Sequence, residues 1–345
     1  MSAVRQAVVM VGGRGTRLFP LTENRPKPLL PVLGVPCVEY VIRRLAEGGV
    51  EELIMACGYR SEDMLQTIGD GNRFGISIEY SFEEVPAGTA GSVKLLEERL
   101  DDRFMVASGD LLADVDMAAT TAAHKGGAIA TMALTTVENP SEFGIVGLDS
   151  EGRIERFLEK PAPEEAFSNL INAGIYVLDR RALESVPSGR PYDFARDLFP
   201  DLLSRGEVLR GHALDGYWKD IGRPADLLQA NLHMAALLGE ASGHPSAEGV
   251  DSASVLLPGS LVEGSRVESS VVGADCRVTD AHLQRSLLLP GVALSAGSEV
   301  IDSIIGANCQ IGARARVRGC VLADGTRVGE GEELNPDSPG VKGIF

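Results

Sequence analysis

Residues 286–328 of the chain read SLLLPGVALSAGSEVIDSIIGANCQIGARARVRGCVLADGTRV. Within each repeat of this stretch an apolar side chain recurs every six residues, at Leu288, Leu294 and Val300 and again at Ile305, Ile311 and Val317. One apolar side chain per six residues, with Gly, Ala or Asp at the corners, suits a triangular solenoid whose faces are short strands that stack on the next coil. The stretch therefore predicts a parallel β-helix.

The same repeat extends on both sides of this stretch. Its units begin at Ser254, Ser270, Ser286, Ser303 and Cys320, so the steps are 16 or 17 residues long. The pattern predicts a left-handed β-helix of about five coils over residues 250–335, followed by a tail at 336–345. A β-sandwich of short strands is the alternative, but its spacing is usually shorter and less uniform.

The chain before residue 239 has a different texture. Short apolar runs typical of strands, at 7–11, 53–57, 76–80 and 104–107, alternate with helical spacing at 38–45, 93–100 and 224–238. This alternation predicts an α/β domain with a mostly parallel sheet over residues 1–238. The small and polar stretch 239–249 is then the linker to the repeats.

Composition excludes several classes of protein. With 345 residues and a net charge of −17, the chain is unsuited to nonspecific binding of nucleic acid or of an anionic membrane. It has no apolar run of about 18 residues and no long apolar leader, so we expect a cytoplasmic protein. Five cysteines without a CxxC pair indicate reduced, buried thiols rather than a metal cage or disulfides.

A glycine-rich turn follows the first predicted strand. Gly12, Gly13 and Gly15 alternate with the forked donors of Arg14 and Arg17, a composition that suits a phosphate cradle. The turn lacks the third glycine of a Rossmann fingerprint and the GK[ST] of a P-loop, and by itself it could be only a tight turn. Lys27 follows between two prolines, Pro26 and Pro28, which stiffen its backbone.

Residues 12–32, GGRGTRLFPLTENRPKPLLPV, closely resemble the N-terminal signature of nucleoside-diphosphate-sugar pyrophosphorylases, the sugar-1-phosphate nucleotidyltransferases. The resemblance implies a Rossmann-like nucleotidyltransferase domain and release of pyrophosphate from a nucleoside triphosphate. It also implies that Arg17 and Lys27 are catalytic. The nucleotide-binding residues that it implies here are Gly12, Gly13, Arg14, Gly15, Thr16, Arg17 and Lys27.

Further segments match the family's pattern in the expected order. The turn at 84–91 resembles the nucleoside-contacting turn, which adds Glu84, Gly88 and Thr89 to the nucleotide site. Glu159 and Lys160 resemble the pair that contacts sugar hydroxyls and sugar phosphate, with Lys160 catalytic. Segments around Gly144, Asn172 and Gly174 resemble the sugar-contacting strands. Each segment alone could be structural, as a helix start or a surface ion pair.

Two acids complete the implied site. Asp110 follows the predicted strand at 104–107, at the edge where open α/β sheets usually bind ligands, and Asp220 ends the segment 216–222. The resemblance makes both of them catalytic metal ligands, and two carboxylates completed by substrate phosphates and water suit Mg2+. The sugar phosphate is already an anionic nucleophile, so we expect direct displacement without a covalent enzyme intermediate.

The start of the chain together with a β-helix tail looks most like mannose-1-phosphate guanylyltransferases. This favours GTP and mannose 1-phosphate, or a similar hexose or cyclitol phosphate, while glucose-1-phosphate adenylyl- or thymidylyltransferases share much of the pattern. A non-catalytic regulatory subunit of the family and an acyltransferase are further alternatives. The only histidine of the repeats, His282, is expected at a solvated corner. We expect the coils to serve a homo-oligomer or regulation.

Overall fold

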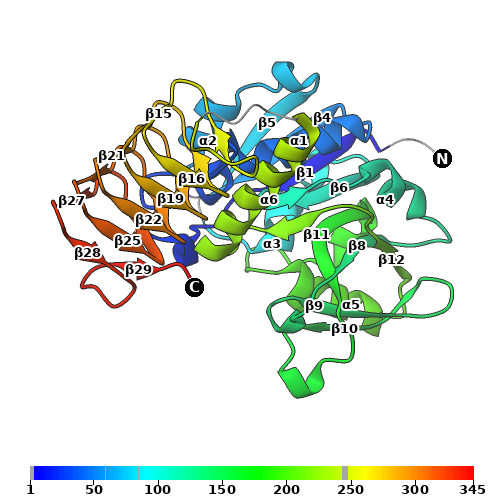
Figure 1. Ribbon diagram of the computed structural model, residues 1–345. Helices are drawn as coiled ribbons and strands as arrows, with labels where there is room; N and C mark the ends of the chain where they lie inside the picture. Colours follow the sequence, from blue (N-terminus) through cyan, green and yellow to red (C-terminus); the bar gives the residue numbers. More distant parts are fainter. Residues whose placement is uncertain (1–3, 59, 84, 243–247) are drawn as a thin grey trace. The chain divides into compact units, whose positions relative to one another are not determined.

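The structure is a computed structural model that describes residues 4–58, 60–83, 85–242 and 248–345. Its contacts group the chain into two compact units (Figure 1). The first unit joins the chain up to Gly13 with Val38–Trp218, and the second joins Arg14–Cys37 with Lys219–Phe345. Over the described ranges, no helix is long and apolar enough to cross a membrane.

The first unit is built on a mixed sheet. Its parallel half has the strand order β6-β1-β4-β5, and each of these strands lies within two residues of its predicted range. Its second half is antiparallel around β11, so the sheet is mixed, and the predicted Rossmann-like α/β fold is confirmed. The strands are β1 (Gln6–Met10), β4 (Glu52–Cys57), β5 (Ser77–Phe82), β6 (Arg103–Ser108), β8 (Ala130–Thr136), β9 (Gly144–Leu148), β10 (Ile154–Glu159), β11 (Leu170–Asp179) and β12 (Leu209–Ala213).

Helices accompany this sheet. The predicted helix at 38–45 is confirmed as α1 (Cys37–Glu47), but the one at 93–100 is shorter than predicted. There α3 (Thr89–Lys94) ends early, and a 3-10 turn at Glu97–Arg99 continues the chain while Leu100 stays buried. A 3-10 turn buries apolar residues at nearly the same spacing, so periodicity alone did not distinguish the two. The other helices are α2 (Ser61–Ile68), α4 (Met117–Ala123) and α5 (Phe199–Ser204).

An aromatic cluster fixes the region between β11 and α5. Tyr176 of β11 lies with its ring centroid 5.2 Å from that of Phe194 and 5.0 Å from that of Phe199. Phe194 begins a π-helical turn, Phe194–Leu198, that leads directly into α5. Such ring pairs add about 0.5–1.5 kcal/mol beyond their buried area, so the cluster anchors this turn against the sheet.

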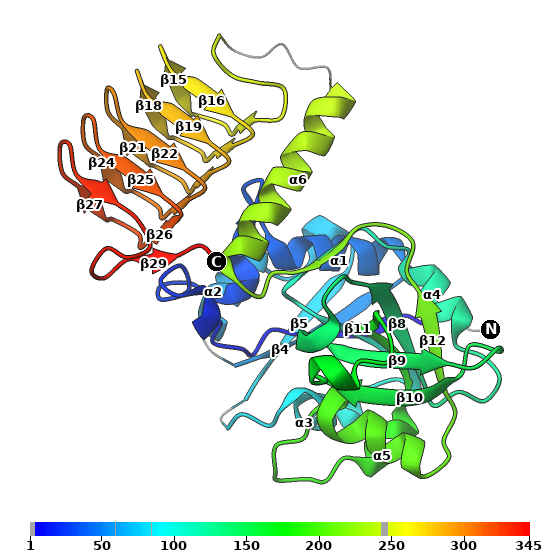
Figure 2. The ribbon, with the colours of Figure 1, turned by 60° about the horizontal axis from the view of Figure 1, so that its bottom comes forward.

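The second unit contains the predicted β-helix. In the described part of the chain, three sheets of parallel strands each contribute one strand to five successive coils (Figure 2). Every predicted six-residue apolar position is buried. The first sheet comprises β14 (Val255–Leu256), β17 (Val271–Val272), β20 (Leu287–Leu288), β23 (Ile304–Ile305) and β26 (Cys320–Leu322). The second comprises β15 (Leu261–Glu263), β18 (Arg277–Thr279), β21 (Ala293–Leu294), β24 (Gln310–Ile311) and β27 (Arg327–Val328). The third comprises β16 (Arg266–Glu268), β19 (His282–Gln284), β22 (Glu299–Ile301), β25 (Arg316–Arg318) and β28 (Glu333–Leu334).

Helix α6 (Pro224–Ser242) belongs to the second unit and is longer than the predicted helix at 224–238. It therefore occupies the first residues of the predicted linker 239–249, of which 243–247 lie outside the described residues. The domain boundary stays a prediction. The buried side chain of Asn231 accepts from Leu33 N (2.9 Å) and donates to Pro31 O (3.1 Å), which ties α6 to the short pair β2 (Pro31–Val32) and β3 (Val35–Pro36).

His282 does not lie at a corner as predicted. It is the first residue of β19, where its Nε2 lies 3.1 Å from Glu268 Oε2 and its Nδ1 lies 3.8 Å from Glu299 Oε2. Because strands of successive coils stack in register, His282 lies between Arg266 and Glu299 in a ladder of polar side chains. The contacts of His282 with two glutamates of neighbouring coils are those expected of a structural residue.

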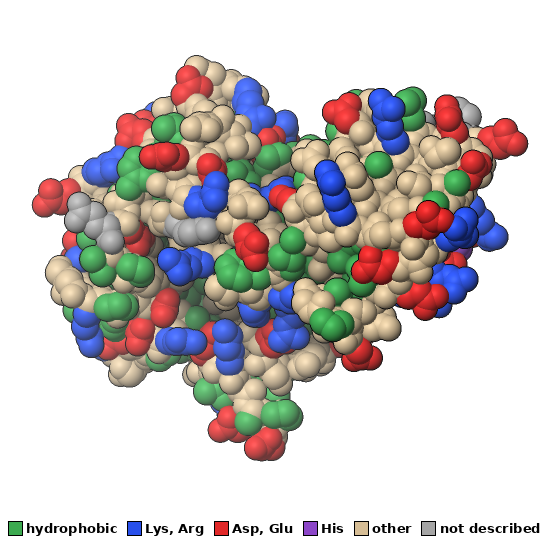
Figure 3. Space-filling model, turned by 90° about the vertical axis from the view of Figure 1, so that its left-hand side faces the viewer, with side chains coloured by type: hydrophobic (Ala, Val, Ile, Leu, Met, Phe, Trp, Pro, Cys, Tyr) green, Lys and Arg blue, Asp and Glu red, His purple; other side chains and the backbone are tan. Residues whose placement is uncertain are grey.

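The surface charge and the state of the cysteines agree with what the composition predicts. One face of the molecule shows acidic and basic side chains interspersed rather than gathered in a basic field (Figure 3). All five cysteines are buried and unbridged, as predicted. Burial raises the pKa of Cys57 to about 12 and the pKa of Cys276 to about 11, so these thiols stay protonated and unreactive.

Candidate active site

Gly15, the last glycine of the glycine-rich turn, packs against Lys27 in the second unit. Gly15 has a φ of +62°, and a β-carbon at this position would lie 2.9 Å from the β-carbon of Lys27, so only glycine fits. The hydroxyl of Thr22 donates to Gly15 O (2.9 Å), and the 3-10 turn Thr16–Leu18 follows. The turn thereby places Arg17 close to Lys27 along the folded segment.

Three of the predicted catalytic residues converge in the second unit. Lys27 Nζ lies 3.4 Å from Asp220 Oδ1, and the two side chains are only 11% and 26% exposed. A β-carbon at Gly222 would lie 3.4 Å from Arg17 Nη2 and 3.4 Å from Asp220 Oδ2. Asp220 thus lies between the two cations: Lys27 contacts one of its oxygens, and Arg17 approaches Gly222 beside the other, with Asp226 Oδ2 also near Gly222. Such a group of cations and carboxylates suits a polyphosphate with its counterion.

In the first unit, two predicted segments leave the sheet at the same edge. β1 and β6 are parallel neighbours, with Met10 opposite Ser108, and Gly109 N donates to Met10 O (3.0 Å). The loop with Gly12 and Gly13 therefore starts beside the loop with Asp110. This is the carboxyl edge at which open α/β sheets bind ligands, as the sequence predicted for Asp110.

A pocket of about 310 Å3 lies next to this edge. It is lined by several predicted residues, Thr89, Glu159 and Lys160, together with Ser108 at the end of β6. Gly144 of β9 pairs with Glu159 of β10, and a β-carbon at Gly144 would lie 2.8 Å from Glu159 Oε2. A side chain at Gly144 would collide with the carboxylate, so the glycine leaves room for it.

Glu159 and Lys160 occupy unusual environments. Burial raises the pKa of Glu159 against the opposing charges of Lys160 and Arg196. Lys160 has a φ of +49°, which a non-glycine residue adopts at a cost, and its Nζ lies 3.9 Å from Glu159 Oε1. The backbone is bent here so that both side chains line one pocket.

Asn172 and Gly174 lie in an irregularity of β11. The pairing of β11 with β8 shifts register between Asn172 and Tyr176. Asn172 closes the bulge, because its Nδ2 donates to the Tyr176 hydroxyl (2.9 Å) and its Oδ1 accepts from Gly174 N (3.0 Å). The indole of Trp218 donates to Ala173 O (2.9 Å). Bulges of this kind often re-aim strands next to active sites.

The turn before α3 is held by the chain around Tyr192. Gly88 has a φ of +76°, and a β-carbon there would lie 2.7 Å from Tyr192 O. The amide and hydroxyl of Thr89 both donate to Asp193 Oδ1 (3.0 Å each), and Thr89 Oγ1 accepts from Phe194 N (2.9 Å). Glu84, also predicted for the nucleotide site, lies outside the described residues.

Asp193 and Arg196 also line the 310 Å3 pocket, and the sequence analysis did not include them. They lie 34 to 37 positions after Glu159 and carry no glycine or proline pattern that would have marked them. The aromatic cluster around Phe194 and the hydrogen bonds of Thr89 bring their turn to the sheet. Arg196 adds a second cation beside Lys160 and Glu159.

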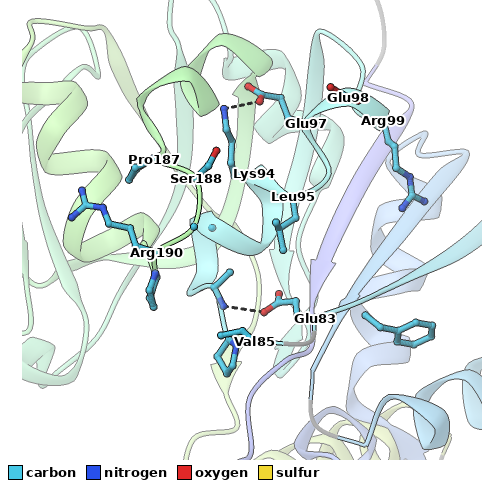
Figure 4. Close-up of a pocket in the computed structure, with 16 residues that line it drawn as sticks. Glu83, Val85, Lys94, Leu95, Glu97, Glu98, Arg99, Pro187, Ser188 and Arg190 are labelled. Atoms are coloured by element: carbon cyan, nitrogen blue, oxygen red, sulfur yellow. Dashed lines mark hydrogen bonds and ion pairs between the residues drawn. The ribbon is translucent and has the colours of Figure 1, made fainter.

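A larger pocket of about 850 Å3 lies on the other side of α3 (Figure 4). Its wall includes the exposed apolar side chains of Val85 and Leu95. The charged groups there are engaged locally: Lys94 pairs with Glu97 (2.6 Å), and Glu83 accepts from Ala87 N (3.2 Å). None of the predicted site residues that the structure describes lines this pocket, so size alone does not mark the active site.

The residues available for a metal are few. Among the described residues there is no group of three or more His, Cys, Asp or Glu side chains that could form a closed metal cage. Asp110 belongs to the first unit and Asp220 to the second, so that they share one ion stays a prediction. The site that the sequence predicts is of the open type, in which one or two carboxylates hold Mg2+ and substrate phosphates supply the other oxygens.

Two family models match the chain. Residues 6–236 match the family model for nucleotidyl transferases, and residues 256–339 match the model for the GlmU-like C-terminal hexapeptide. The chain is 35% identical over 297 residues to a mannose-1-phosphate guanylyltransferase of Mycobacterium tuberculosis, a match that covers 84% of this chain and 81% of that protein. It is 37% identical over 240 residues to a UTP–glucose-1-phosphate uridylyltransferase of Synechocystis, covering 65% and 62%.

A third relative is a mannose-1-phosphate guanyltransferase of Yarrowia lipolytica, 38% identical over 239 residues, which covers 67% of this chain and 65% of that protein. Among solved structures, one from Bacillus anthracis assigned as a glucose-1-phosphate thymidylyltransferase, in complex with sucrose, matches with a TM-score of 0.59 and 27% identity. That match covers 66% of this chain and 93% of the other. With its catalytic-domain match over two thirds of its length, the chain belongs to the nucleotidyl transferase family of sugar-1-phosphate nucleotidyltransferases.

Proposed function

We propose that the protein transfers a nucleoside monophosphate from GTP to mannose 1-phosphate, or to a similar hexose or cyclitol phosphate, and releases pyrophosphate. The observation that carries the proposal is that Asp220 lies beside Lys27 and, at Gly222, beside Arg17. The preference for GTP and mannose 1-phosphate rests on two relatives, 35% and 38% identical to the chain, that are named mannose-1-phosphate guanylyltransferase and guanyltransferase.

The nucleotide is bound by the glycine-rich turn. Backbone amides of Gly12, Gly13, Gly15 and Thr16 approach the phosphates, with Arg14 beside them. Arg17 and Lys27 neutralise the triphosphate and stabilise the charge that develops on departing pyrophosphate. Gly88, Thr89 and Glu84 belong to the part of the site that contacts the nucleoside.

Asp110 and Asp220 would hold the divalent metal, for which we propose Mg2+. When bound, this ion neutralises phosphate oxygens and acts as a Lewis acid on the triphosphate. Asp220 is also the partner of Lys27, 3.4 Å away, so the carboxylate keeps that ammonium oriented before substrate binds. Asp220 would then both bind the metal and orient the ammonium group of Lys27.

The sugar phosphate is bound by the 310 Å3 pocket. Lys160 and Arg196 attract its phosphate, and Glu159 accepts hydrogen bonds from sugar hydroxyls. Gly144, Asn172 and Gly174 shape the sugar side of the pocket through the close approach at β9 and the bulge in β11. The acceptor's phosphate oxygen attacks the α-phosphorus directly, because it is already anionic and requires no general base.

Relatives named for other substrates provide the competing assignments. The uridylyltransferase is 37% identical, in the range of the guanylyltransferases, and the structure assigned as a thymidylyltransferase is 27% identical. An adenylyltransferase and a non-catalytic regulatory subunit are the further alternatives from the sequence. Choice of base depends on a few hydrogen bonds, so each nucleotide must be tested. We also propose a homo-oligomer with contacts through the β-helix, which light scattering of the eluted protein would detect.

The deciding experiment measures pyrophosphate release with Mg2+ for GTP, ATP, UTP and dTTP, each against mannose, glucose and cyclitol 1-phosphates. We expect GTP with mannose 1-phosphate to give the highest kcat/KM. Asp110→Ala should abolish release, whereas Asp102→Asn, which changes a 93% exposed carboxylate, should not. Nucleotide binding without release for any pair would favour the regulatory subunit instead.

A further inference from the structure

The C-terminal residues return along the last coil of the β-helix. Lys342 and Gly343 form β29 (Lys342–Gly343), which pairs antiparallel with β26 through Val321 and Cys320. Ile344 N donates to Gly319 O (2.9 Å), and the Ile344 side chain is only 1% exposed. The terminal residues are therefore a fixed strand on the solenoid.

This strand reaches the glycine-rich turn. Lys342 Nζ donates to the carbonyl oxygen of Arg17 at 2.5 Å, and burial lowers the pKa of this lysine. Arg17 is the middle residue of the 3-10 turn Thr16–Leu18, in which Phe19 N donates to Thr16 O (3.3 Å). A bond from a charged donor to that carbonyl fixes the peptide plane from which the Arg17 side chain projects.

A second contact joins the same segment to the last coil. Arg25 forms an ion pair with Asp324, and both side chains are about one-fifth exposed, at 22% and 21%. Asp324 is itself held, because its Oδ1 accepts from Ala307 N (2.8 Å) in the coil before. Arg25 lies two residues before Lys27, so this pair restrains the approach to Lys27.

The other end of the segment is held by different elements. A β-carbon at Gly34 would lie 2.8 Å from the side chain of Leu257, which follows β14 in the first coil. Asn231 of α6 bonds to Leu33 and Pro31. The segment Arg14–Cys37 is thus in contact with the first coil, the last coil and the C-terminal strand, all within one compact unit.

We propose that Lys342 and Asp324 are positioning residues that hold Arg17 and Lys27 in the conformation that binds the triphosphate. The β-helix then has a role in the reaction that requires neither a partner nor a second active site. The proposal rests on the proposed function for its catalytic consequence, but the restraint of the segment can be measured without turnover.

The kinetic test uses substitutions that remove one contact each. Lys342→Met keeps the apolar stem of the side chain and removes its donor, while Asp324→Asn keeps the acceptor for Ala307 N and removes the charge opposite Arg25. We expect each to raise the KM for the nucleoside triphosphate by about five- to twentyfold, with a smaller fall in kcat and an unchanged KM for the sugar phosphate. Lys342→Arg should restore part of the affinity, and Lys125→Met, at an exposed lysine, is the matched control.

The structural test is limited proteolysis with trypsin, with cleavage sites identified by mass spectrometry. Loss of the contacts should speed cleavage after Arg14 and Arg17 in Lys342→Met, but not in Lys125→Met; Arg25 and Lys27 precede prolines and are not cleaved. Equal cleavage rates together with an unchanged nucleotide KM would overturn the proposal. If the wild-type protein releases no pyrophosphate, the proposed function fails, and the cleavage rates still decide whether the strand restrains the segment.

Discussion

At the scale of single residues, Glu159 shows how environment assigns a role. Its carboxylate is half-buried beside Gly144, and burial raises its pKa although Lys160 and Arg196 oppose that shift. An ionised carboxylate accepts hydrogen bonds on both oxygens, whereas protonation turns one oxygen into a donor and removes the charge that strengthens these bonds. Its ionisation should therefore be visible in the pH dependence of sugar-phosphate use.

We predict that kcat/KM for the sugar phosphate falls as the pH drops through the raised pKa of Glu159, at higher pH than an ordinary carboxyl of pKa 4.5 would cause. Glu159→Gln should lower kcat/KM by about tenfold to a hundredfold and remove this acid limb. The phosphate of the substrate also titrates, near pH 6, so the ratio of wild type to variant is the quantity to plot. A ratio that does not change with pH contradicts the assignment.

Thr89 connects α3 to the pocket through bonds of its hydroxyl to Asp193 and Phe194. We predict that Thr89→Val, which keeps the shape of the side chain, raises the KM for the sugar phosphate about three- to tenfold, because the turn with Asp193 and Arg196 loosens. Thr89→Ser should restore the wild-type value. If Thr89→Ser also raised the KM for the sugar phosphate, the methyl group of Thr89, and not its hydroxyl, would be the group that matters.

At the scale of elements, the β-helix is joined by a ladder of buried serines. Each hydroxyl accepts from the amide that begins the next coil: Ser254 from Ser270 N, Ser270 from Ser286 N, Ser286 from Ser303 N and Ser303 from Cys320 N, at 3.0–3.1 Å. The hydroxyl of Ser286 also donates to Gln284 O (2.7 Å). The serines that begin each repeat therefore not only mark its length but also link each coil to the next by a hydrogen bond.

We predict that Ser286→Ala destabilises the protein by about 1–3 kcal/mol, because the buried amide of Ser303 loses its partner. Ser286→Cys should cost less, since a cysteine already occupies this position of the repeat at Cys320. Urea unfolding monitored by circular dichroism measures both. Equal stability of Ser286→Ala and the wild type would show that the ladder contributes nothing.

At the scale of the whole molecule, metal should matter for turnover but not for folding. The described residues contain no closed cluster of metal ligands, and only two carboxylates, Asp110 and Asp220, are proposed to hold the ion. We predict that EDTA abolishes pyrophosphate release and shifts the melting temperature of the substrate-free protein by less than about 1 °C. Activity should return on addition of Mg2+. A drop of several degrees would instead reveal a structural metal.

Much of the architecture could be predicted from local pattern. The strands β1, β4, β5 and β6 and the five coils follow from runs of apolar residues whose period is fixed by backbone geometry. One prediction failed at the early end of α3, because an α-helix and a 3-10 turn bury apolar residues at nearly the same spacing. Another failed at His282, because a polar side chain at this strand position interrupts the apolar repeat as a corner residue would. The extension of α6 to Ser242 was missed because Gly239 and Ser242 have low helix propensity, which packing and the rest of the helix override.

The sequence by itself determined the family, the two kinds of architecture and the residue types of the site, because glycine turns, a proline-flanked lysine and a six-residue repeat are readable within a few dozen positions. Only the tertiary structure decided which distant residues meet. Asp193 and Arg196 join Glu159 through packing of an aromatic cluster, and Lys342 reaches Arg17 across 325 positions. Such contacts depend on how the elements pack, which the spacing of residues along the chain does not encode.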